Sequence, residues 1–501
     1  MKNSLKAFFI LSFVCLAAYS NALHNDFLID DHDLILGNPP AHHLDFVRHQ
    51  LAPWATDSAT TVKPPYYRPL AHIIPFFLYV AFKTNVTGYH MVDLLLFILL
   101  CFSIYSLLNS LLNDRTLSLI TSLLFAMHPL SGILMNYKNL GAVLSLQALA
   151  MIWASIFFLK EKQKILSLLL FIIANLCHDT AIILPLYLLL FSYFKNQKLT
   201  KRDIIRTVPF FIIAALFLTI RLSLTSASGG TLEQIKLYPL NFLEYLATYA
   251  KIIAWYVSKF INLDGIVLIW AAPVVKTHLF AWISLLIAGG AVLAGIFASR
   301  KKYPEIFLLV GWLVIGFAAV AWGSLYGLQY GLLIEPHWLI FPSIGIFALM
   351  AFALLKLRDL IDKRIFYVLI AAVLFTLIAF TRDANRTWAH EKIYCKYWLK
   401  YVPGFIPAKN FLASHYMRQG QMGEAKKLLL EIVQAEPTHA LTYSKLGWIY
   451  YLEGDFKEAI KNYEQALRLF PNSVVIKHYL GLTYEKTGDL KKAADLLRVA
   501  K

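Results

Sequence analysis

The chain has 501 residues, of which 58% are hydrophobic and only 15% are charged, and its mean hydropathy is +0.59. This composition excludes an ordinary soluble globular protein and is typical of a polytopic membrane protein. The formal net charge of +17 could favour nucleic-acid binding, but the cations occupy short connections between apolar segments. We therefore expect membrane lipids as partners of this chain, and no nucleic acid.

Apolar segments recur through the first three quarters of the chain and predict about eleven membrane spans. They lie near residues 7–22, 89–110, 116–130, 139–159, 165–177, 180–194, 207–224, 277–298, 304–323, 337–355 and 365–381. Lysines and arginines gather in connections on one side, including 160–164, 195–206, 300–302 and 356–364. Such connections are typically cytoplasmic. The loop 23–88 and the segment after residue 381 are then expected on the periplasmic side of a bacterial inner membrane.

An acidic loop follows the first apolar segment, which we expect to remain as an uncleaved anchor. Asp26, Asp30, Asp31 and Asp33 all fall within eight positions at the start of loop 23–88. Carboxylates at the mouth of a membrane helix cost free energy unless they bind cations or perform chemistry. The loop is therefore a candidate functional site. The alternative is a solvated loop with an aspartate as a helix N-cap.

Two stretches of the outer loops, 69–82 and 242–261, combine aromatic and polar residues and predict helices at the membrane surface. The chain as a whole is expected to divide into a membrane domain at 1–381, with the catalytic outer loop at 23–88, a linker at 382–402 and a repeat domain at 403–501. The predicted fold class is all-α: a polytopic helical bundle followed by an α-solenoid.

The last segment repeats with a period of 34 residues, which is typical of tetratricopeptide repeats. The recurring columns are Gly420, Gly454 and Gly488; Ala425, Ala459 and Ala493; Leu412, Leu446 and Leu480; Tyr416, Tyr450 and Tyr484; and Pro403, Pro437 and Pro471. We expect the small residues to let the two helices of each repeat approach, and Leu and Tyr to fill the seam between repeats. A protein partner is the expected ligand of this domain.

Motifs spread over nearly the whole chain resemble the transmembrane and tetratricopeptide-repeat family of O-mannosyltransferases, within the GT-C type of glycosyltransferases that use lipid-phosphate sugars. They are segments 26–31, 38–39, 67–70, 88–90, 125–129, 178–180 and 342–345. The chain departs from the family at 140–143, where a Gly-Arg pair is usual, and at His178-Asp179, where Lys-Glu is usual. The resemblance implies transfer of mannose or another hexose from a polyprenyl-phosphate donor to a protein hydroxyl, with inversion.

Such a transfer needs a base for the acceptor hydroxyl and cations for the leaving phosphate. The resemblance implies Asp30 as the base, with Asp31 or Asp33 orienting it or holding a divalent cation such as Mg²⁺ or Mn²⁺. Arg68 is the first candidate for the phosphate, because its guanidinium can bind two phosphate oxygens at once. Arg221 and Lys138 are further candidates, with membrane anchoring as the alternative.

Further candidates for substrate binding lie at the outer ends of the predicted spans: His90, His128, His178, Glu335 and His337. The histidines lack the spacing of a metal site, and hydrated interfacial histidines are the alternative. A glycine-rich phosphate loop is absent from the sequence, which disfavours a soluble nucleotide donor. Two competing hypotheses remain: a membrane-anchored scaffold for exported proteins, and a transferase that acts on lipid or glycan acceptors.

Overall fold

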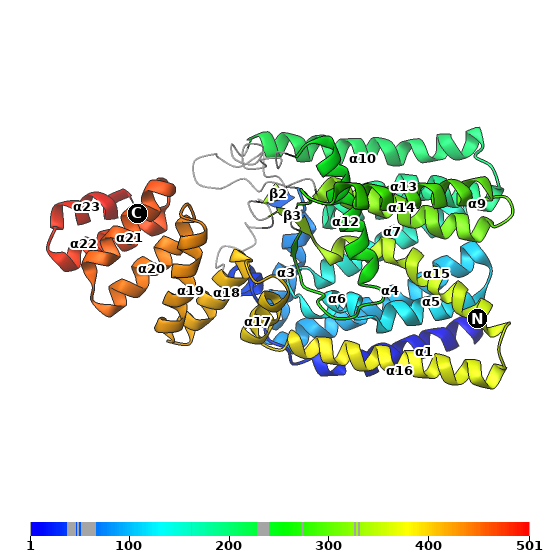
Figure 1. Ribbon diagram of the computed structural model, residues 1–501, viewed down its shortest axis with the longest axis horizontal. Helices are drawn as coiled ribbons and strands as arrows, with labels where there is room; N and C mark the ends of the chain where they lie inside the picture. The colour runs from blue at the N-terminus through cyan, green and yellow to red at the C-terminus, as the bar shows by residue number, and fades with distance from the viewer. Residues whose placement is uncertain are drawn as a thin grey trace. The chain divides into compact units, whose positions relative to one another are not determined.

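The computed structural model describes residues 2–37, 47, 50–51, 67–161, 163–227, 240–272, 274–324, 327–328 and 331–499. Residues 38–39, which contribute to the family resemblance, lie outside this range. The described chain is almost wholly helical, as the sequence predicts, and forms two compact units, Met1–His390 and Glu391–Lys501 (Figure 1). The predicted linker 382–402 contains the end of helix α16 (Lys363–Thr387) and the whole of helix α17 (Glu391–Tyr401).

The first unit is a bundle of apolar helices of different lengths. They are α1 (Lys2–Tyr19), α3 (Pro69–Phe82), α4 (Val86–Leu112), α5 (Arg115–Met127), α6 (Ile133–Asn136), α7 (Gly141–Leu159), α8 (Lys164–Cys177), α9 (Leu184–Asn196), α10 (Lys201–Ala227), α12 (Phe242–Ser258), α13 (Leu279–Ala298), α14 (Pro304–Ser324), α15 (Ile340–Arg358) and α16 (Lys363–Thr387). Short turns of helix join them: η1 (Ser20–Ala22), η2 (His32–Leu36), η4 (Pro129–Gly132), η5 (Asp179–Ile183) and η6 (Pro336–Leu339).

Seven helices in the described residues are long and apolar enough to cross a membrane, and an eighth crossing results if the bent pair 115–136 is one span. The seven are Ser4–Ala22, Val86–Leu112, Gly141–Leu159, Lys201–Ser223, Leu279–Ala298, Pro336–Arg358 and Lys363–Thr387. The other predicted spans also form helices, but α8 has only 14 residues and α9 only 13. About 20 residues are needed for a full crossing, so length does not support a count of eleven.

Aromatic side chains fill the centre of the bundle. The ring of Phe125 on α5 lies 5.9 Å from Phe97 on α4 and 5.9 Å from Phe347 on α15. All three side chains are fully buried, so they contribute van der Waals contacts, which drive helix association within a membrane. This packing joins the consecutive helices α4 and α5 to α15, which is distant in sequence. Helix α1 lies along α4, α5 and α16 (Figure 1).

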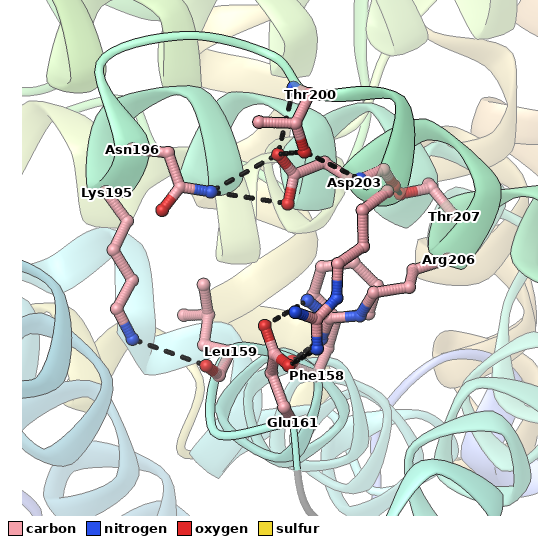
Figure 2. A network of polar contacts seen from close by, with 10 residues as sticks. Phe158, Leu159, Glu161, Lys195, Asn196, Thr200, Asp203, Arg206 and Thr207 are labelled. Atoms are coloured by element: carbon pink, nitrogen blue, oxygen red, sulfur yellow. Dashed lines mark hydrogen bonds and ion pairs between the residues drawn. The ribbon is translucent and has the colours of Figure 1, made fainter.

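A polar network closes the end of the bundle where α7 meets α8 and α9 meets α10 (Figure 2). Asp203 accepts hydrogen bonds from the backbone N–H of Thr200 at 3.0 Å, from its hydroxyl at 2.6 Å and from Asn196 at 3.2 Å. Glu161 binds Arg206 at 2.9 Å and also pairs with Arg202. These contacts satisfy the first turn of α10 and join two connections that the sequence predicts as cytoplasmic.

A small sheet, which the all-α prediction did not include, lies between α12 and α15 in the chain. It has the order β1 (Trp270–Ala272), β3 (Gly331–Ile334), β2 (Gly327–Leu328), and both pairs are antiparallel. Trp270 pairs with Ile334 in the register, and its ring stacks on Trp255 of α12 at 4.8 Å. The sheet fixes the backbone that leads directly into Glu335.

The second unit consists of α17 (Glu391–Tyr401), α18 (Ile406–Arg418), α19 (Met422–Ala435), α20 (Ala440–Glu453), α21 (Phe456–Leu469), α22 (Val474–Thr487) and α23 (Leu490–Val499). Helices α18 to α23 pair in sequence order as helical hairpins. The alanine column is buried, with Ala425, Ala459 and Ala493 at 0%, 0% and 3% exposure. This agrees with the expected close approach of the paired helices.

The glycine column has a different role from the expected one. Gly420, Gly454 and Gly488 have φ of +73°, +79° and +84°, and a Cβ there would meet no atom within 4 Å. These glycines supply the left-handed residue that ends a helix. Close helix approach depends instead on Gly447 and Gly481, where a Cβ would lie 2.8 Å from Tyr463 and 2.9 Å from Leu497.

Candidate functional site

The acidic loop is held against the bundle by buried polar contacts. Asn25 donates to Asn136 at 2.8 Å, and the ring of His90 lies 2.9 Å from the carbonyl of Asn25 and 3.0 Å from that of Met135. Ile29 follows with φ of +45° while 1% exposed. A buried β-branched residue in the left-handed region is strained. The surrounding contacts therefore impose the conformation that precedes Asp30.

Asp30 and Asp31 have different surroundings despite being neighbours. Asp31 is fully buried and accepts backbone N–H groups from Leu28 at 3.1 Å and Asn139 at 2.8 Å. Burial raises the pKa of Asp31 to about 7. Asp30 is half-buried and accepts a hydrogen bond from the hydroxyl of Tyr137 at 2.8 Å. Of the two, Asp30 is therefore the carboxylate that a substrate can reach.

Asp33 lies in η2, and the orientation of its side chain is outside the described part of the structure. Within the described residues, no group of three or more His, Cys, Asp or Glu side chains is arranged to hold a metal ion. The donors that surround Asp31 are backbone N–H groups, which stabilise an anion and do not ligate a cation. The predicted role of these aspartates as cation ligands remains a prediction for Asp30, Asp31 and Asp33.

Two arginines share one carboxylate next to the acidic loop. Arg68, just before α3, binds Asp179 with both ends of its guanidinium, at 2.9 Å and 3.1 Å, and Arg221 of α10 pairs with the same carboxylate. Burial raises the pKa of Asp179, but the two arginines more than offset this and leave it below its ordinary value. The two guanidiniums and the carboxylate therefore form one group of charged side chains.

A cavity of about 400 Å³ opens beside this arginine pair. Its wall is mostly apolar, and the polar groups gather at Arg68, Asp179 and Arg221. The lining consists of Tyr67, Arg68, Asn175, His178, Asp179, Thr180, Ile182, Ile183, Phe217, Leu218, Arg221, Val320 and Trp338. An apolar cavity with cationic groups on its wall suits an amphiphile with an anionic head group.

Glu335, His337 and His178 form a second polar group near the arginines. The side chain of Glu335 is 20% exposed and lies 3.1 Å from Nε2 of His337. The rings of His337 and His178 are perpendicular, with centroids 5.6 Å apart. The pKa of Glu335 is raised to about 7, mainly by burial. The charge of Asp30 also raises this pKa, and the charge of Arg68 lowers it. Glu335 therefore interacts electrostatically with both the phosphate candidate and the base candidate.

Three predicted site residues have structural partners instead of facing this cavity. Lys138 is 1% exposed, pairs with Asp93 of α4 and donates to the carbonyl of Met135 at 2.7 Å. His128 accepts the N–H of Leu130 at 3.1 Å as the cap of η4. His90 joins two backbone carbonyls, as described above. The polar atoms of these residues therefore have partners inside the bundle, and their roles in substrate or phosphate binding remain predictions.

Sequence reasoning missed three residues that hold predicted site residues in place. Asp93 pairs with Lys138, Tyr137 donates to Asp30, and Tyr256 donates to the carbonyl of Glu335. Asp93 is an acid within an otherwise apolar span, and such a residue usually has a buried partner. That signal could have identified the pair with Lys138. The two tyrosines carry no comparable signal, because aromatic residues are frequent in every segment of this chain.

Comparisons with known proteins agree with the repeats. Residues 406–472 and 450–501 match the tetratricopeptide repeat family. A protein of Pyropia yezoensis named "Uncharacterized protein ycf37" is 38% identical over 96 residues, which cover 18% of this chain and 54% of that protein. The chain thus spans about half the length of this curated relative. The C-terminal region is therefore a set of tetratricopeptide repeats, which generally mediate protein–protein interaction and fit a protein partner.

Two solved structures, both described as MamA, also match part of the chain. The first, "MamA AMB-1", is 21% identical, covers 31% of this chain and 80% of its own, and has a TM-score of 0.20. The second, a mutant, has the same identity and coverage and a TM-score of 0.21.

Proposed function

We propose that this protein is an integral membrane glycosyltransferase that moves a hexose from a polyprenyl-phosphate carrier to a hydroxyl of an exported protein. The observation that carries the proposal is the arginine pair on the wall of an apolar cavity of about 400 Å³. A lipid phosphate has an anionic head and an apolar chain, and both find complementary surfaces there. The family resemblance adds support, because motif segments 67–70 and 178–180 meet in the ion pair between Arg68 and Asp179.

The proposed chemistry assigns one role to each group. The acceptor oxygen attacks the anomeric carbon of the donor while the bond from that carbon to the phosphate oxygen breaks. Asp30 takes the proton of the acceptor hydroxyl, and Arg68 and Arg221 stabilise the charge that develops on the leaving phosphate. Direct displacement inverts the anomeric configuration. The repeats bind the acceptor protein on the periplasmic side of a bacterial inner membrane.

The test is hexose transfer by the purified protein from a defined polyprenyl-phosphate hexose. Asp30→Asn keeps the size of the side chain and removes its basicity, so we expect turnover to fall by about 10²-fold or more. Asp26→Asn is the matched control on the same loop, because Asp26 is exposed and pairs with His390. Equal turnover in the two variants, or no transfer by the unmodified protein from any hexose donor, would contradict the proposal.

The second candidate function is a membrane-anchored scaffold that recruits exported proteins, and the tetratricopeptide match favours it. In a scaffold, Asp30 supports structure only, so Asp30→Asn should leave partner recruitment unchanged. In the transferase, Asp30→Asn should abolish the sugar while the partner still binds. Pull-down of exported proteins combined with detection of attached hexose therefore separates the two functions. Loss of hexose from a lipid or glycan on deletion would instead identify a different acceptor.

A further inference from the structure

The backbone of Glu335 is fixed from two sides. The residue follows β3, whose Ile334 pairs with Trp270 and is fully buried. From α12, the buried Tyr256 donates its hydroxyl to the carbonyl of Glu335 at 3.1 Å. The position of the carboxylate therefore depends on a sheet and a helix and not on a loose loop, as a precise binding group requires.

The contacts of His178 and His337 indicate which of their ring nitrogens are donors and which are acceptors. Nδ1 of His178 accepts the N–H of Thr180 at 3.3 Å, so the ring proton lies on Nε2. Nε2 of His337 lies 3.1 Å from a carboxylate oxygen of Glu335. When the ring proton is on Nε2 and faces this carboxylate, Nδ1 of the neutral ring is an acceptor. These two remaining nitrogens are buried and have no partner among the described residues. One is a donor and the other an acceptor, on rings only 5.6 Å apart.

This complementarity means that one water molecule between the rings can satisfy both nitrogens. His178 then supports His337, and His337 supports one oxygen of Glu335. Both rings are at most 5% exposed, which keeps solvent out of the chain of contacts. Among the described residues no hydrogen-bond donor contacts the other oxygen of Glu335, so it remains for a ligand that offers hydroxyl or amide protons.

The contacts of Glu335 indicate where this ligand lies. Its carboxylate lies beside His337, whose ring is 5.6 Å from that of His178, and His178 lines the cavity next to Arg68 and Asp179. The charges of Arg68 and Asp30 also act on the Glu335 carboxylate. In the proposed reaction the transferred sugar must lie between these two groups. A carboxylate at this point meets the sugar hydroxyls, and hydrogen bonds to such hydroxyls strengthen as the anomeric carbon becomes positive.

We propose that Glu335, positioned by His337 and His178, binds hydroxyl groups of the donor hexose and determines which lipid-phosphate sugar the protein uses. This inference rests on the proposed function, because it needs a lipid phosphate at Arg68. Glu335 is a binding residue, since it touches the substrate. His337 and His178 are positioning residues that act through it.

The experiment compares binding of farnesyl phosphate, farnesyl-phosphate mannose and farnesyl-phosphate glucose to the full-length protein in detergent, by isothermal titration calorimetry. The variants are Glu335→Gln and Glu335→Asp, because the first removes the charge and the second retracts it by one methylene. His337→Gln tests the positioning. Glu161→Gln is the matched control, because it removes a carboxylate from the network at the far end of α7 (Figure 2).

We expect the unmodified protein to bind one sugar lipid about tenfold or more tightly than farnesyl phosphate, and to prefer it over the other sugar lipid. Both Glu335 variants should keep their affinity for farnesyl phosphate within about twofold and lose the extra affinity for the sugar lipid. His337→Gln should lose part of it, and Glu161→Gln none. Glu335→Asp answers the question if Glu335→Gln does not fold.

Two results would overturn the inference while leaving the proposed function intact: unchanged sugar preference in both Glu335 variants, or equal weakening of all three lipids, which would indicate a purely structural role. A different result refutes the proposed function itself. If the unmodified protein binds none of the three lipids, the cavity is not a lipid-phosphate site, and the inference falls with it.

Discussion

Two clusters in the bundle share one composition and differ in their surroundings. In each, one carboxylate binds two arginines: Asp179 binds Arg68 and Arg221, and Glu161 binds two arginines near the start of α10 (Figure 2). Arg221 lies roughly 22 Å along α10 from the start of the second cluster's contacts at Arg206, at 1.5 Å per residue. Helix α10 therefore joins the two clusters.

The surroundings distinguish a site from a structural contact. Glu161 is 42% exposed, and Asp203 beside it is satisfied by Thr200 and Asn196. Asp179 is 16% exposed and borders an apolar cavity of about 400 Å³, with buried unpartnered histidine nitrogens nearby. Exposed ion pairs contribute little to stability. The comparison shows that burial, adjacent space and unsatisfied polar atoms identify the candidate site, and that the ion pairs alone do not.

The same substitution at both clusters gives the largest expected contrast. Arg68→Lys keeps the charge but loses the two-point contact, so we expect the KM for the lipid-phosphate donor to rise about tenfold or more. Arg206→Lys at the opposite cluster should change it less than twofold. Steady-state kinetics with donor and acceptor varied in turn provide the measurement. Equal effects of the two substitutions would remove the distinction between the clusters.

Deletion of residues 403–501 tests whether the repeats matter for the acceptor and not for the donor. The repeats raise the local concentration of a bound protein, so transfer to a large protein acceptor should fall by about tenfold, while transfer to a short peptide changes little. The first unit forms its own compact body, and the deletion should leave it folded. Equal loss for both acceptors, in a monodisperse truncated protein, would assign the repeats to fold support.

The smallest expected effect concerns the stability of the acidic loop. The pKa of Asp31 is about 7 in the folded protein and 3.8 without its surroundings, so the folded state binds the proton more tightly. The stabilisation is complete below pH 3.8 and is lost as the pH rises through 7. Between pH 5 and 7, the unmodified protein should lose stability about 1 kcal/mol per pH unit faster than Asp31→Asn. Thermal unfolding in detergent measures both slopes, and parallel slopes would contradict the burial argument.

The sequence predicts helices well because their signals are local. Apolar runs, the 34-residue period and the surface helices 69–82 and 242–261 all correspond to helices, because periodicity depends on near neighbours. The sequence reveals the glycine column but not its role. A backbone with positive φ and a close approach of two helices both favour glycine, so the sequence does not distinguish them. Gly454 illustrates this, with φ of +79° and open space around it.

The site was predicted in part, and the reason lies in long-range pairing. Arg68 was singled out by its own chemistry, but its partner Asp179 is more than a hundred positions away, and no local pattern joins the two. Lys138 was a second candidate from its place near a span end, yet Asp93 pairs with it inside the bundle. Which cation faces a cavity depends on the tertiary pairing of helices, and a single sequence does not encode that in any short window.

The most direct test of the central claim is the position of a bound lipid phosphate. A structure of the full-length protein determined with saturating farnesyl phosphate should show the phosphate at Arg68 and Arg221 and the isoprenoid chain in the cavity that Phe217 and Leu218 line. Density for the phosphate at the Glu161 cluster, or an unfilled cavity at saturating lipid, would contradict the account.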